Sequence, residues 1–213
     1  MFKNMKIGMR LALSFSIILV FMIVIILVSL NQIKVSQTLF DRVIRVNNVR
    51  LQLANTMIDH TREVSINLRN ILLLKESLKT LELKNKIDSI RNMYDRDFNK
   101  FEELIAVDDT MSFLLAGKVK SSQEASRQHN NMILDLAFAD KYNEAIILMN
   151  EKASKAVADW IIDIEDLITY TEKRSEMRYS EAEKIQATAR IFMFLLGSVA
   201  IALAIMISIL LTL

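Results

Sequence analysis

Two long uncharged apolar segments constrain the fold of this 213-residue chain more than any other feature. The first segment is Leu11–Leu30, and the second is Ile191–Leu213. A helix of about twenty apolar residues crosses the hydrocarbon core of a bilayer, which is roughly 30 Å thick. We therefore predict transmembrane helices at 11–30 and 191–213, and we expect the lipid bilayer to be a partner of the chain.

The first apolar segment begins like a signal peptide, but its length favours a retained anchor. The apolar region of a signal peptide spans about 7–15 residues and precedes a small-residue cleavage site, and no such site follows Leu30. Lys3, Lys6 and Arg10 come before the segment with no acidic residue among them. Because basic flanks stay on the cytoplasmic side, residues 1–10 are expected to be a cytoplasmic leader and residues 31–190 to be periplasmic or extracellular.

The composition predicts that the rest of the chain is all-α. The chain has no Pro and only three Gly, whereas sheets and phosphate-binding loops draw on these residues for their turns. It also has no Cys, which excludes disulfides, thiolate metal sites and Cys nucleophiles. Residues 31–190 hold 24 of the 27 Lys and Arg and all 25 Asp and Glu. This near-neutral balance argues against a nucleic-acid partner.

Lapses in the apolar period divide residues 31–190 into helices. The first helix is expected to leave the membrane without interruption and to fray over Lys75–Thr80. A second apolar stripe predicts a helix over Leu83–Ile105.

Asp108 or Asp109 is positioned to cap a third helix, expected at about Thr110–Phe138. The polar middle of this helix, residues 118–131, is expected to be exposed or flexible. The apolar period predicts that five residues face inward, namely Met111, Leu115, Ala125, Met132 and Leu136.

Asp140 is expected to cap a short segment over Tyr142–Met149, and a fourth helix should run from about Glu151 into the second span. The expected fold is thus an antiparallel four-helix bundle whose first and last helices continue into the two transmembrane helices.

Three segments resemble the sensory part of bacterial methyl-accepting chemotaxis proteins that have a four-helix-bundle ligand-binding domain. The first is the basic leader Met1–Leu11 (MFKNMKIGMRL), and the second is Arg69–Leu73 (RNILL). The third is Phe138–Leu148 (FADKYNEAIIL), which is similar to the acid-started turn and short helix before the family's fourth helix. The resemblance covers all 213 residues. Members of that family continue into a cytoplasmic signalling region, so we expect this chain, which ends at Leu213, to be either truncated or a stand-alone sensor.

The resemblance implies a small-molecule ligand, such as an amino acid or organic acid, that binds in the membrane-distal bundle between two subunits. Arg62 and Arg69 lie on one helix face, and a guanidinium binds a carboxylate in bidentate fashion. We name both as candidate ligand contacts. The structural alternative is that Arg69 pairs with Asp159 or Asp163, or is simply solvated.

Three other residues complete the candidate ligand site. Thr61 and Ser65 interrupt an apolar stripe, so they either line a pocket or permit close helix packing. Trp160 is expected at a similar height on the fourth helix, where it is either a pocket wall or core filler. Asn47 falls on the same stripe, and a buried Asn can fix the register of a homodimer.

No catalytic constellation is visible. His60 and His129 are the only histidines and have no second ligand at helical spacing, so we expect neither a metal site nor a cofactor. The predicted function is a transmembrane chemoreceptor module, not an enzyme, in a bacterial inner membrane. The alternatives are the input domain of a sensor histidine kinase or cyclic-dinucleotide enzyme, and a two-span interaction protein that senses nothing.

Overall fold

The computed structural model describes residues 7–41 and 46–212, and every element in that part of the chain is a helix. The all-α prediction is therefore confirmed. The described residues divide into two compact units, one drawn from 1–43 and 176–213 and the other from 44–175. The elements are α1 (Ile7–Asp41), α2 (Asn48–Leu74), α3 (Ser77–Glu103), α4 (Thr110–Phe138), α5 (Tyr142–Leu148), the π-helix η3 (Met149–Ala153) and α6 (Ser154–Thr212).

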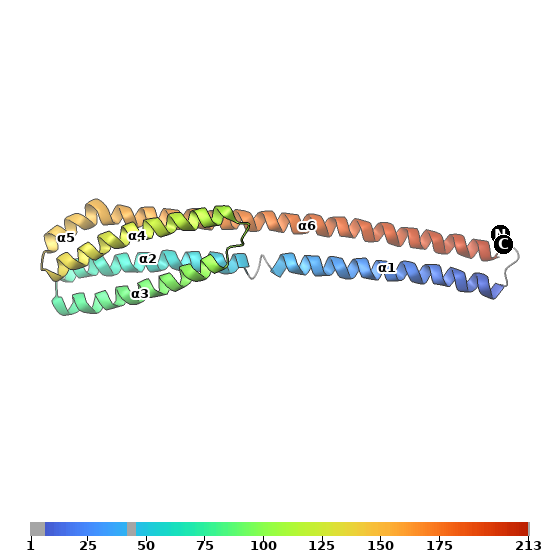
Figure 1. Ribbon diagram of the computed structural model, residues 1–213, viewed down its shortest axis with the longest axis horizontal. Coiled ribbons are helices and arrows are strands. Elements are labelled where there is room, and N and C mark those ends of the chain that lie inside the picture. The colour runs from blue at the N-terminus through green and yellow to red at the C-terminus, as the bar shows by residue number, and fades with distance from the viewer. Residues whose placement is uncertain (1–6, 42–45, 213) are drawn as a thin grey trace. The chain divides into compact units, whose positions relative to one another are not determined.

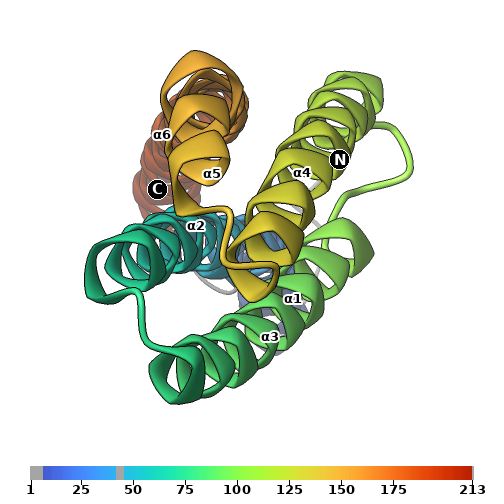
Figure 2. The same ribbon diagram turned by 90° about the vertical axis from the view of Figure 1, so that its left-hand side faces the viewer.

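The unit 44–175 is an antiparallel four-helix bundle. Along the chain, α2, α3, α4 and the first part of α6 alternate in direction (Figure 1). Seen from the end, they occupy four separate positions, with α5 joining α4 to α6 (Figure 2). The predicted up-down-up-down bundle is confirmed in this unit.

The bundle core consists of two apolar clusters. Burying a large aliphatic side chain contributes about 1.5–3 kcal/mol, so both clusters stabilise the bundle substantially. The Trp160 cluster contains Leu53, Ala54, Met57, Ile58, Tyr94, Phe98, Phe101, Ile105, Leu115, Ala116, Val119, Trp160, Ile164 and Leu167. The Ile71 cluster contains Val64, Leu68, Ile71, Leu72, Ile87, Ile90, Ile133, Leu134, Ala137, Ala145, Met149 and Ala153.

The turn between α2 and α3 is shorter than the sequence predicted. Instead of fraying over 75–80, α2 ends at Leu74 and α3 begins at Ser77. Lys75 adopts a left-handed conformation with φ of 54°, and its N–H donates to the carbonyl oxygen of Ile71. This left-handed cap ends the helix without Gly, because Lys75 takes the conformation that Gly usually supplies.

The structure confirms the bounds of α4 but not its predicted inward face. Leu115 is buried and Leu136 is half-buried, as expected, whereas Met111, Ala125 and Met132 are exposed. The prediction for those three was wrong because it placed only apolar residues on the buried face.

Polar residues take the inward positions in the middle of α4. Gln123, Ser126 and Asn130 are buried, at 6%, 0% and 1% exposure. They repeat at a spacing of three and four residues, which places them on one helix face. The expectation that this whole stretch is exposed or flexible was therefore wrong for these positions.

Asp140 does not cap α5 as predicted. It has a left-handed backbone with φ of 57°, and the residue that precedes α5 is Lys141, whose side chain makes no capping hydrogen bond. Asp tolerates this conformation better than most residues do. From Tyr142 the chain then passes through α5, η3 and α6 with no intervening loop, so η3 joins the predicted short segment to the fourth helix.

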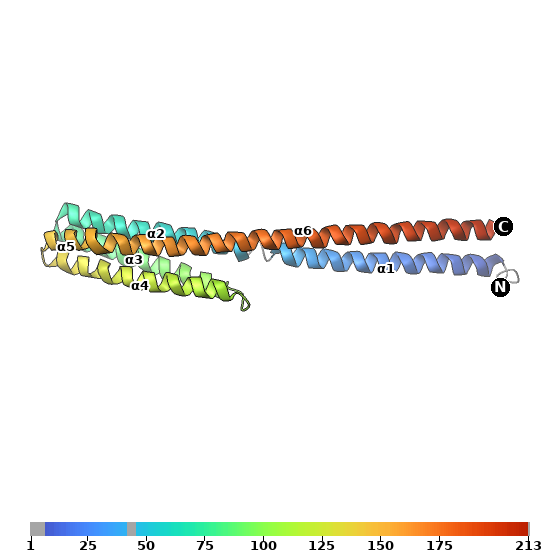
Figure 3. The ribbon, with the colours of Figure 1, turned by 90° about the horizontal axis from the view of Figure 1, so that it is seen from above.

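The unit formed by α1 and residues 176–212 of α6 pairs two apolar helices side by side (Figures 1 and 3). Gln186 Nε2 donates to Ser36 Oγ at 2.7 Å, and Ser29 Oγ lies 3.2 Å from Met193 Sδ. By length and composition both helices suffice to cross a membrane. Their most apolar windows are 0% and 6% buried inside the protein.

Some sequence predictions fall outside the described residues. The basic residues Lys3 and Lys6 belong to residues 1–6, and the predicted continuity of the first helix runs through 42–45. These two predictions stay predictions.

Candidate functional site

The two candidate arginines of α2 point away from the bundle core. The Arg62 side chain is 56% exposed, and its Nη1 lies 3.7 Å from Asp59 Oδ1 one turn away. Arg69 is exposed and has no ion pair within the described part of the chain. The proposed pairing of Arg69 with Asp159 or Asp163 is not made.

Thr61 and Ser65 lie on the opposite side of α2, facing the core. Both are buried, and Thr61 Oγ1 donates to the carbonyl oxygen of Met57 at 2.9 Å. Within one chain the four candidate residues of α2 therefore do not converge on a common pocket. Ligand contact by any of them stays a prediction.

Trp160 is part of the core. It is 2% exposed, and its Nε1 donates to the Tyr94 hydroxyl at 2.9 Å. The two rings also meet edge to face, with centroids 4.8 Å apart and an interplanar angle of 63°. Burial raises the pKa of Tyr94, so the phenol stays neutral and acts as the hydrogen-bond acceptor. This arrangement matches the structural alternative for Trp160.

The remaining candidates occupy separate positions. His60 Nε2 lies 3.3 Å from Asp97 Oδ2 on α3. Asn47 is buried, and its Nδ2 has no hydrogen-bond partner among the residues that the structure describes. Within residues 7–41 and 46–212, no group of three or more acidic or His side chains is arranged to hold a metal ion.

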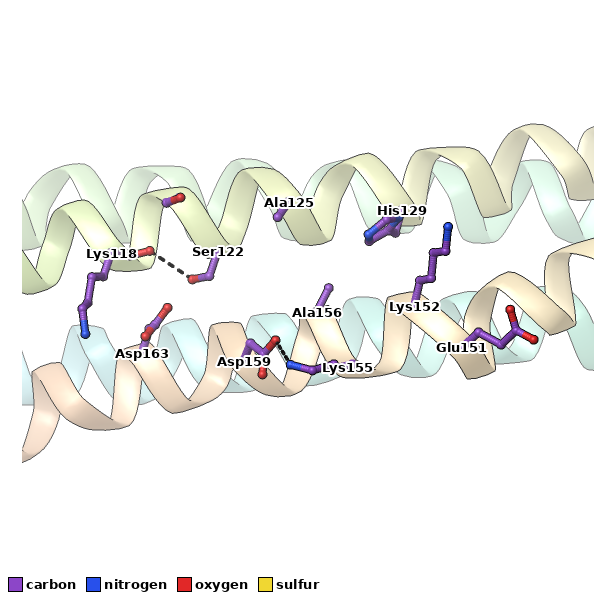
Figure 4. Close-up of a pocket in the computed structure, with 11 residues that line it drawn as sticks. Lys118, Ser122, Ala125, His129, Glu151, Lys152, Lys155, Ala156, Asp159 and Asp163 are labelled. Atoms are coloured by element: carbon purple, nitrogen blue, oxygen red, sulfur yellow. Dashed lines mark hydrogen bonds and ion pairs between the residues drawn. The ribbon is translucent and has the colours of Figure 1, made fainter.

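An open groove of about 540 Å³ lies between α4 and the beginning of α6, with η3 at one end (Figure 4). Its volume falls in the range of roughly 300–1,000 Å³ that small-molecule sites occupy. The groove is lined by Lys118, Ser121, Ser122, Ala125, His129, Glu151, Lys152, Lys155, Ala156, Asp159 and Asp163.

The groove forms where small side chains meet an interruption of the apolar core. Ser121, Ser122 and Ala125 on α4 and Ala156 on α6 leave space between the two helices. On α4, this stretch falls between Val119 of the Trp160 cluster and Ile133 of the Ile71 cluster. Close apolar packing between α4 and α6 is therefore replaced by a polar, accessible region.

Charged groups of both signs line the groove. Lys155 Nζ pairs with Asp159 Oδ2 at 2.6 Å. Across the described residues, Lys118, Glu151, Lys152 and Asp163 line the groove and have no ion pair or side-chain hydrogen bond. The His129 side chain also lines the groove, and its Nδ1 is buried and has no hydrogen-bond partner within 7–41 and 46–212.

A second polar site, which we call the Asp109 junction, links α2, the start of α4 and α6. Arg50 of α2 is 2% exposed, and its Nη1 lies 3.3 Å from Asp109 Oδ2. Asp109 Oδ1 accepts hydrogen bonds from the Ser112 backbone N–H at 3.2 Å and the Tyr170 hydroxyl at 3.0 Å. The same oxygen lies 2.7 Å from Arg174 Nη1. One carboxylate thus holds side chains from three helices.

The electrostatics of the junction favour an ionised Asp109. Burial by itself would raise the pKa of this carboxyl, but hydrogen bonds from Ser112 and Tyr170 and the charge of Arg174 outweigh it and lower the pKa. Burial also lowers the pKa of Arg50, and Asp109 opposes that shift. The Arg50 guanidinium lies over the Phe101 ring, 4.8 Å from its centroid, which places further negative potential beside the cation.

Sequence analysis identified only one part of the junction, the capping role of Asp109. The position of Arg50 in the sequence did indicate burial. Arg50 lies four and seven residues before Ala54 and Met57, so it falls on the same helix face as these buried residues. A charged residue on the buried stripe indicates a buried partner. Tyr170 and Arg174 carried no such signal, since they join the site only through packing of α6.

The fold and the two candidate spans define the class of this protein as a helical-bundle domain with helices suited to a membrane. Residues 4–185 match the family described as the four-helix-bundle sensory module for signal transduction. The chain therefore belongs to this family of sensory modules, and the resemblance stated from the sequence is confirmed. The family is a signalling module and not a catalytic one. Comparison with the curated proteins and with the solved structures gives no match.

Proposed function

We propose that the chain is the sensor module of a two-span chemoreceptor. In this proposal residues 31–190 lie outside a bacterial inner membrane, the N-terminus is cytoplasmic, and two copies form a homodimer. A small molecule of the amino-acid or organic-acid class binds the bundle. Binding shifts a membrane-spanning helix by a small distance, and this displacement transmits the signal across the membrane for chemotaxis.

The Asp109 junction is the observation that carries this proposal. It connects α2 to α6 through buried, charge-assisted contacts, which are stronger than neutral hydrogen bonds. Furthermore, α6 is a single helix from Ser154 to Thr212 and contains apolar sequence long enough to span a membrane. A shift of α6 against the junction would therefore be passed along one unbroken helix.

The expected displacement is a piston or tilt of about 1–2 Å, which is typical of helix shifts in signalling proteins. The sequence has no Pro that would kink α6 and absorb such a movement. A ligand shifts the equilibrium only if its affinity for the two helix packings differs.

Crosslinking between α1 and α6 tests the displacement. Ser36→Cys with Gln186→Cys replaces a side-chain contact of 2.7 Å, and the chain has no other Cys. The full chain in lipid nanodiscs would be screened for binding of amino acids and organic acids. Any probe that binds should change the rate of disulfide formation at this pair.

A matched pair in the bundle provides the control. Glu63→Cys with Lys86→Cys replaces an ion pair of 2.9 Å between α2 and α3, and its crosslinking rate should stay constant. Binding that leaves both rates unchanged would refute transmission by helix displacement and favour the two-span interaction protein.

The outward face of α2 supports the homodimer. Ile66 and Leu73 are 53% and 77% exposed and lie seven residues apart, so they share a face with the exposed Arg62 and Arg69. If two α2 helices meet there, a single Ile66→Cys should crosslink between copies, whereas Asn143→Cys on exposed α5 should not. Failure of both to crosslink would argue against a dimer through α2.

Fusion of the chain to different output regions tests which output the sensor controls. Joining the chain to the signalling region of a chemoreceptor should make kinase control respond to the bound probe. A response only when the chain is joined to a histidine kinase or cyclic-dinucleotide enzyme would favour those outputs instead.

A further inference from the structure

We propose that the α4–α6 groove is the ligand site and that it takes a small zwitterion carrying one ammonium and one carboxylate group. This inference rests on the proposed sensor function and specifies where the ligand binds and what charges it bears. In this site Lys152 faces the carboxylate, and Glu151 faces the ammonium group.

The first observation is the pair of opposite charges at the η3 end of the groove. Glu151 and Lys152 both line the groove and are consecutive residues. Side chains of neighbouring residues on a helix diverge, so these two do not neutralise each other. Figure 4 shows Lys152 reaching from η3 toward α4 while Glu151 points along the groove in another direction. A molecule with both charges meets a counter-charge at each of its ends.

The second observation is the environment of His129. Its side chain lines the groove, and its Nδ1 is buried and has no hydrogen-bond partner in the described part of the chain. In Figure 4 this ring lies on α4, and the Lys152 side chain reaches toward α4 from the facing side of the groove. The Lys152 ammonium group is therefore the donor that this end of the groove offers to a carboxylate, and the His129 ring forms part of the groove wall.

The third observation is the π-helical backbone that carries both charged residues. η3 covers Met149–Ala153, where an α-helix would continue with different side-chain directions. Met149 and Ala153 are buried in the Ile71 cluster, which fixes η3 in place. Single-turn π-helical segments inside helices occur frequently at functional sites. Here the segment turns Glu151 and Lys152 toward the groove while its apolar residues remain in the core.

The opposite end of the groove is less suited to the ligand. In Figure 4, Lys118 of α4 and Asp163 of α6 both project into the space between the two helices at this end. Ser122 Oγ already donates to the carbonyl oxygens of Lys118 and Val119. Glu151 and Asp163 are twelve residues apart, or about 18 Å along a helix, so a single small zwitterion occupies only one end.

Binding to the full chain in nanodiscs tests the charge requirement. The probes are the standard L-amino acids, their C-terminal amides and their N-acetyl derivatives, with affinity measured by calorimetry. We expect at least one amino acid to bind, and we expect its amide and its N-acetyl derivative to bind at least tenfold more weakly. Equal affinity of the three forms would overturn the zwitterion assignment.

Variants with matched controls test the location. Glu151→Gln and Lys152→Gln should each weaken binding roughly tenfold or more, because each removes a charge-assisted contact. Glu172 and Lys173 form the same dipeptide on the exposed surface of α6, so Glu172→Gln and Lys173→Gln should leave the affinity unchanged. Helical content and the unfolding midpoint without probe establish that all four variants fold.

Two outcomes would overturn the assignment of a zwitterion site to the α4–α6 groove and leave the sensor proposal intact. If Arg69→Ala abolishes binding while Lys152→Gln does not, the ligand binds on α2. If no standard amino acid binds but an organic acid binds and alters disulfide formation in the double variant Ser36→Cys/Gln186→Cys, the ligand is not a zwitterion. Binding in the groove without any change in crosslinking would instead refute the sensor proposal and retain the site.

Discussion

Arg50 and Asp109 form an ion pair of 3.3 Å in which both side chains are almost completely buried, at 2% and 0% exposure. The two residues are 59 positions apart, one near the start of α2 and the other immediately before α4. A buried charge without a partner is costly, so the Arg50 cation requires Asp109, whereas Asp109 also contacts Arg174. The pair therefore fixes α2 against the beginning of α4, and Tyr170 and Arg174 extend this connection to α6.

Replacement of Asp109 should destabilise the bundle strongly. Asp109→Ala leaves the Arg50 guanidinium buried without its counter-charge and removes the N-cap of α4. Loss of one partner of a buried ion pair typically costs about 3–5 kcal/mol. We expect a loss of unfolding free energy of this size, measured by denaturant unfolding of the full chain in detergent micelles.

A double-mutant cycle separates the pair from the cap. Arg50→Met removes the cation and keeps an apolar side chain over Phe101. Combined with Asp109→Ala, it should cost clearly less than the sum of the two single variants, since the double variant no longer contains the buried Arg50 cation without its counter-charge. Additive losses would mean that Arg50 and Asp109 contribute independently.

The pH dependence of stability should also report on Asp109. Its pKa in the folded protein lies below the ordinary value of 3.8, so the unfolded chain takes up this proton first as the pH falls. The contribution of Asp109 is thus complete above the unfolded pKa and is lost as the pH drops through 3.8 toward the folded pKa.

We therefore expect the unfolding midpoint of the unmodified chain to fall more steeply between about pH 5 and pH 3 than that of Asp109→Asn. The other carboxylates are common to both proteins and cancel in the difference. Parallel curves would show that the pKa of Asp109 is the same in the folded and unfolded chain.

Tyr94→Phe should reveal how much the hydrogen bond of Trp160 contributes to stability. The change removes the acceptor of the Trp160 Nε1–H hydrogen bond and keeps the edge-to-face ring contact. A buried N–H left without a partner costs about 1–3 kcal/mol of unfolding free energy. Phe98→Leu, which alters the same cluster but breaks no hydrogen bond, is the comparison. If Tyr94→Phe is neutral in thermal unfolding, the Trp160 N–H contributes nothing to stability.

Local sequence signals predicted the helices of the bundle well. The cap at Asp109 and the bounds Thr110–Phe138 depend on neighbouring residues alone, so they could be obtained without tertiary information. Asp140 shows the limit of that approach. An acidic residue before a helix either caps it or takes a left-handed turn, and local sequence does not distinguish the two.

Buried polar residues could not be predicted from apolar periodicity. Gln123 is buried because its Nε2 donates to Asp95 Oδ1 at 2.9 Å, and Arg127 makes two contacts with the same carboxylate at 3.0 and 2.7 Å. Asp95 lies on α3, so the partner of both residues is known only once α3 and α4 are paired. The apolar periodicity of α4, considered without α3, therefore predicts that these positions are exposed to solvent.

The sequence suggested the α2 candidates from their chemistry, and it gave no indication of the α4–α6 groove. Arg62 and Arg69 were named because a guanidinium suits a carboxylate ligand, and both lie on the outward face of α2. The α4–α6 groove depends on small residues of two helices and on the π-helical η3, neither of which follows from spacing along the chain. Thr61 was placed on the apolar stripe of α2 and is buried, and Trp160 matches the core-filler alternative given for it.

Gly117→Ala should stabilise the bundle, because this glycine has no structural role that requires the absence of a side chain. It lies inside α4, has no positive φ, and a Cβ added there meets no atom within 4 Å. Gly in a helix interior costs roughly 0.5–1 kcal/mol relative to Ala, largely through the entropy of the unfolded chain. We expect an increase of this size in unfolding free energy. The reverse change at an exposed position of the same helix, Ala125→Gly, should lower it by a similar amount. A destabilised Gly117→Ala protein would show that the surface of α4 at Gly117 packs closely against a second copy of the chain.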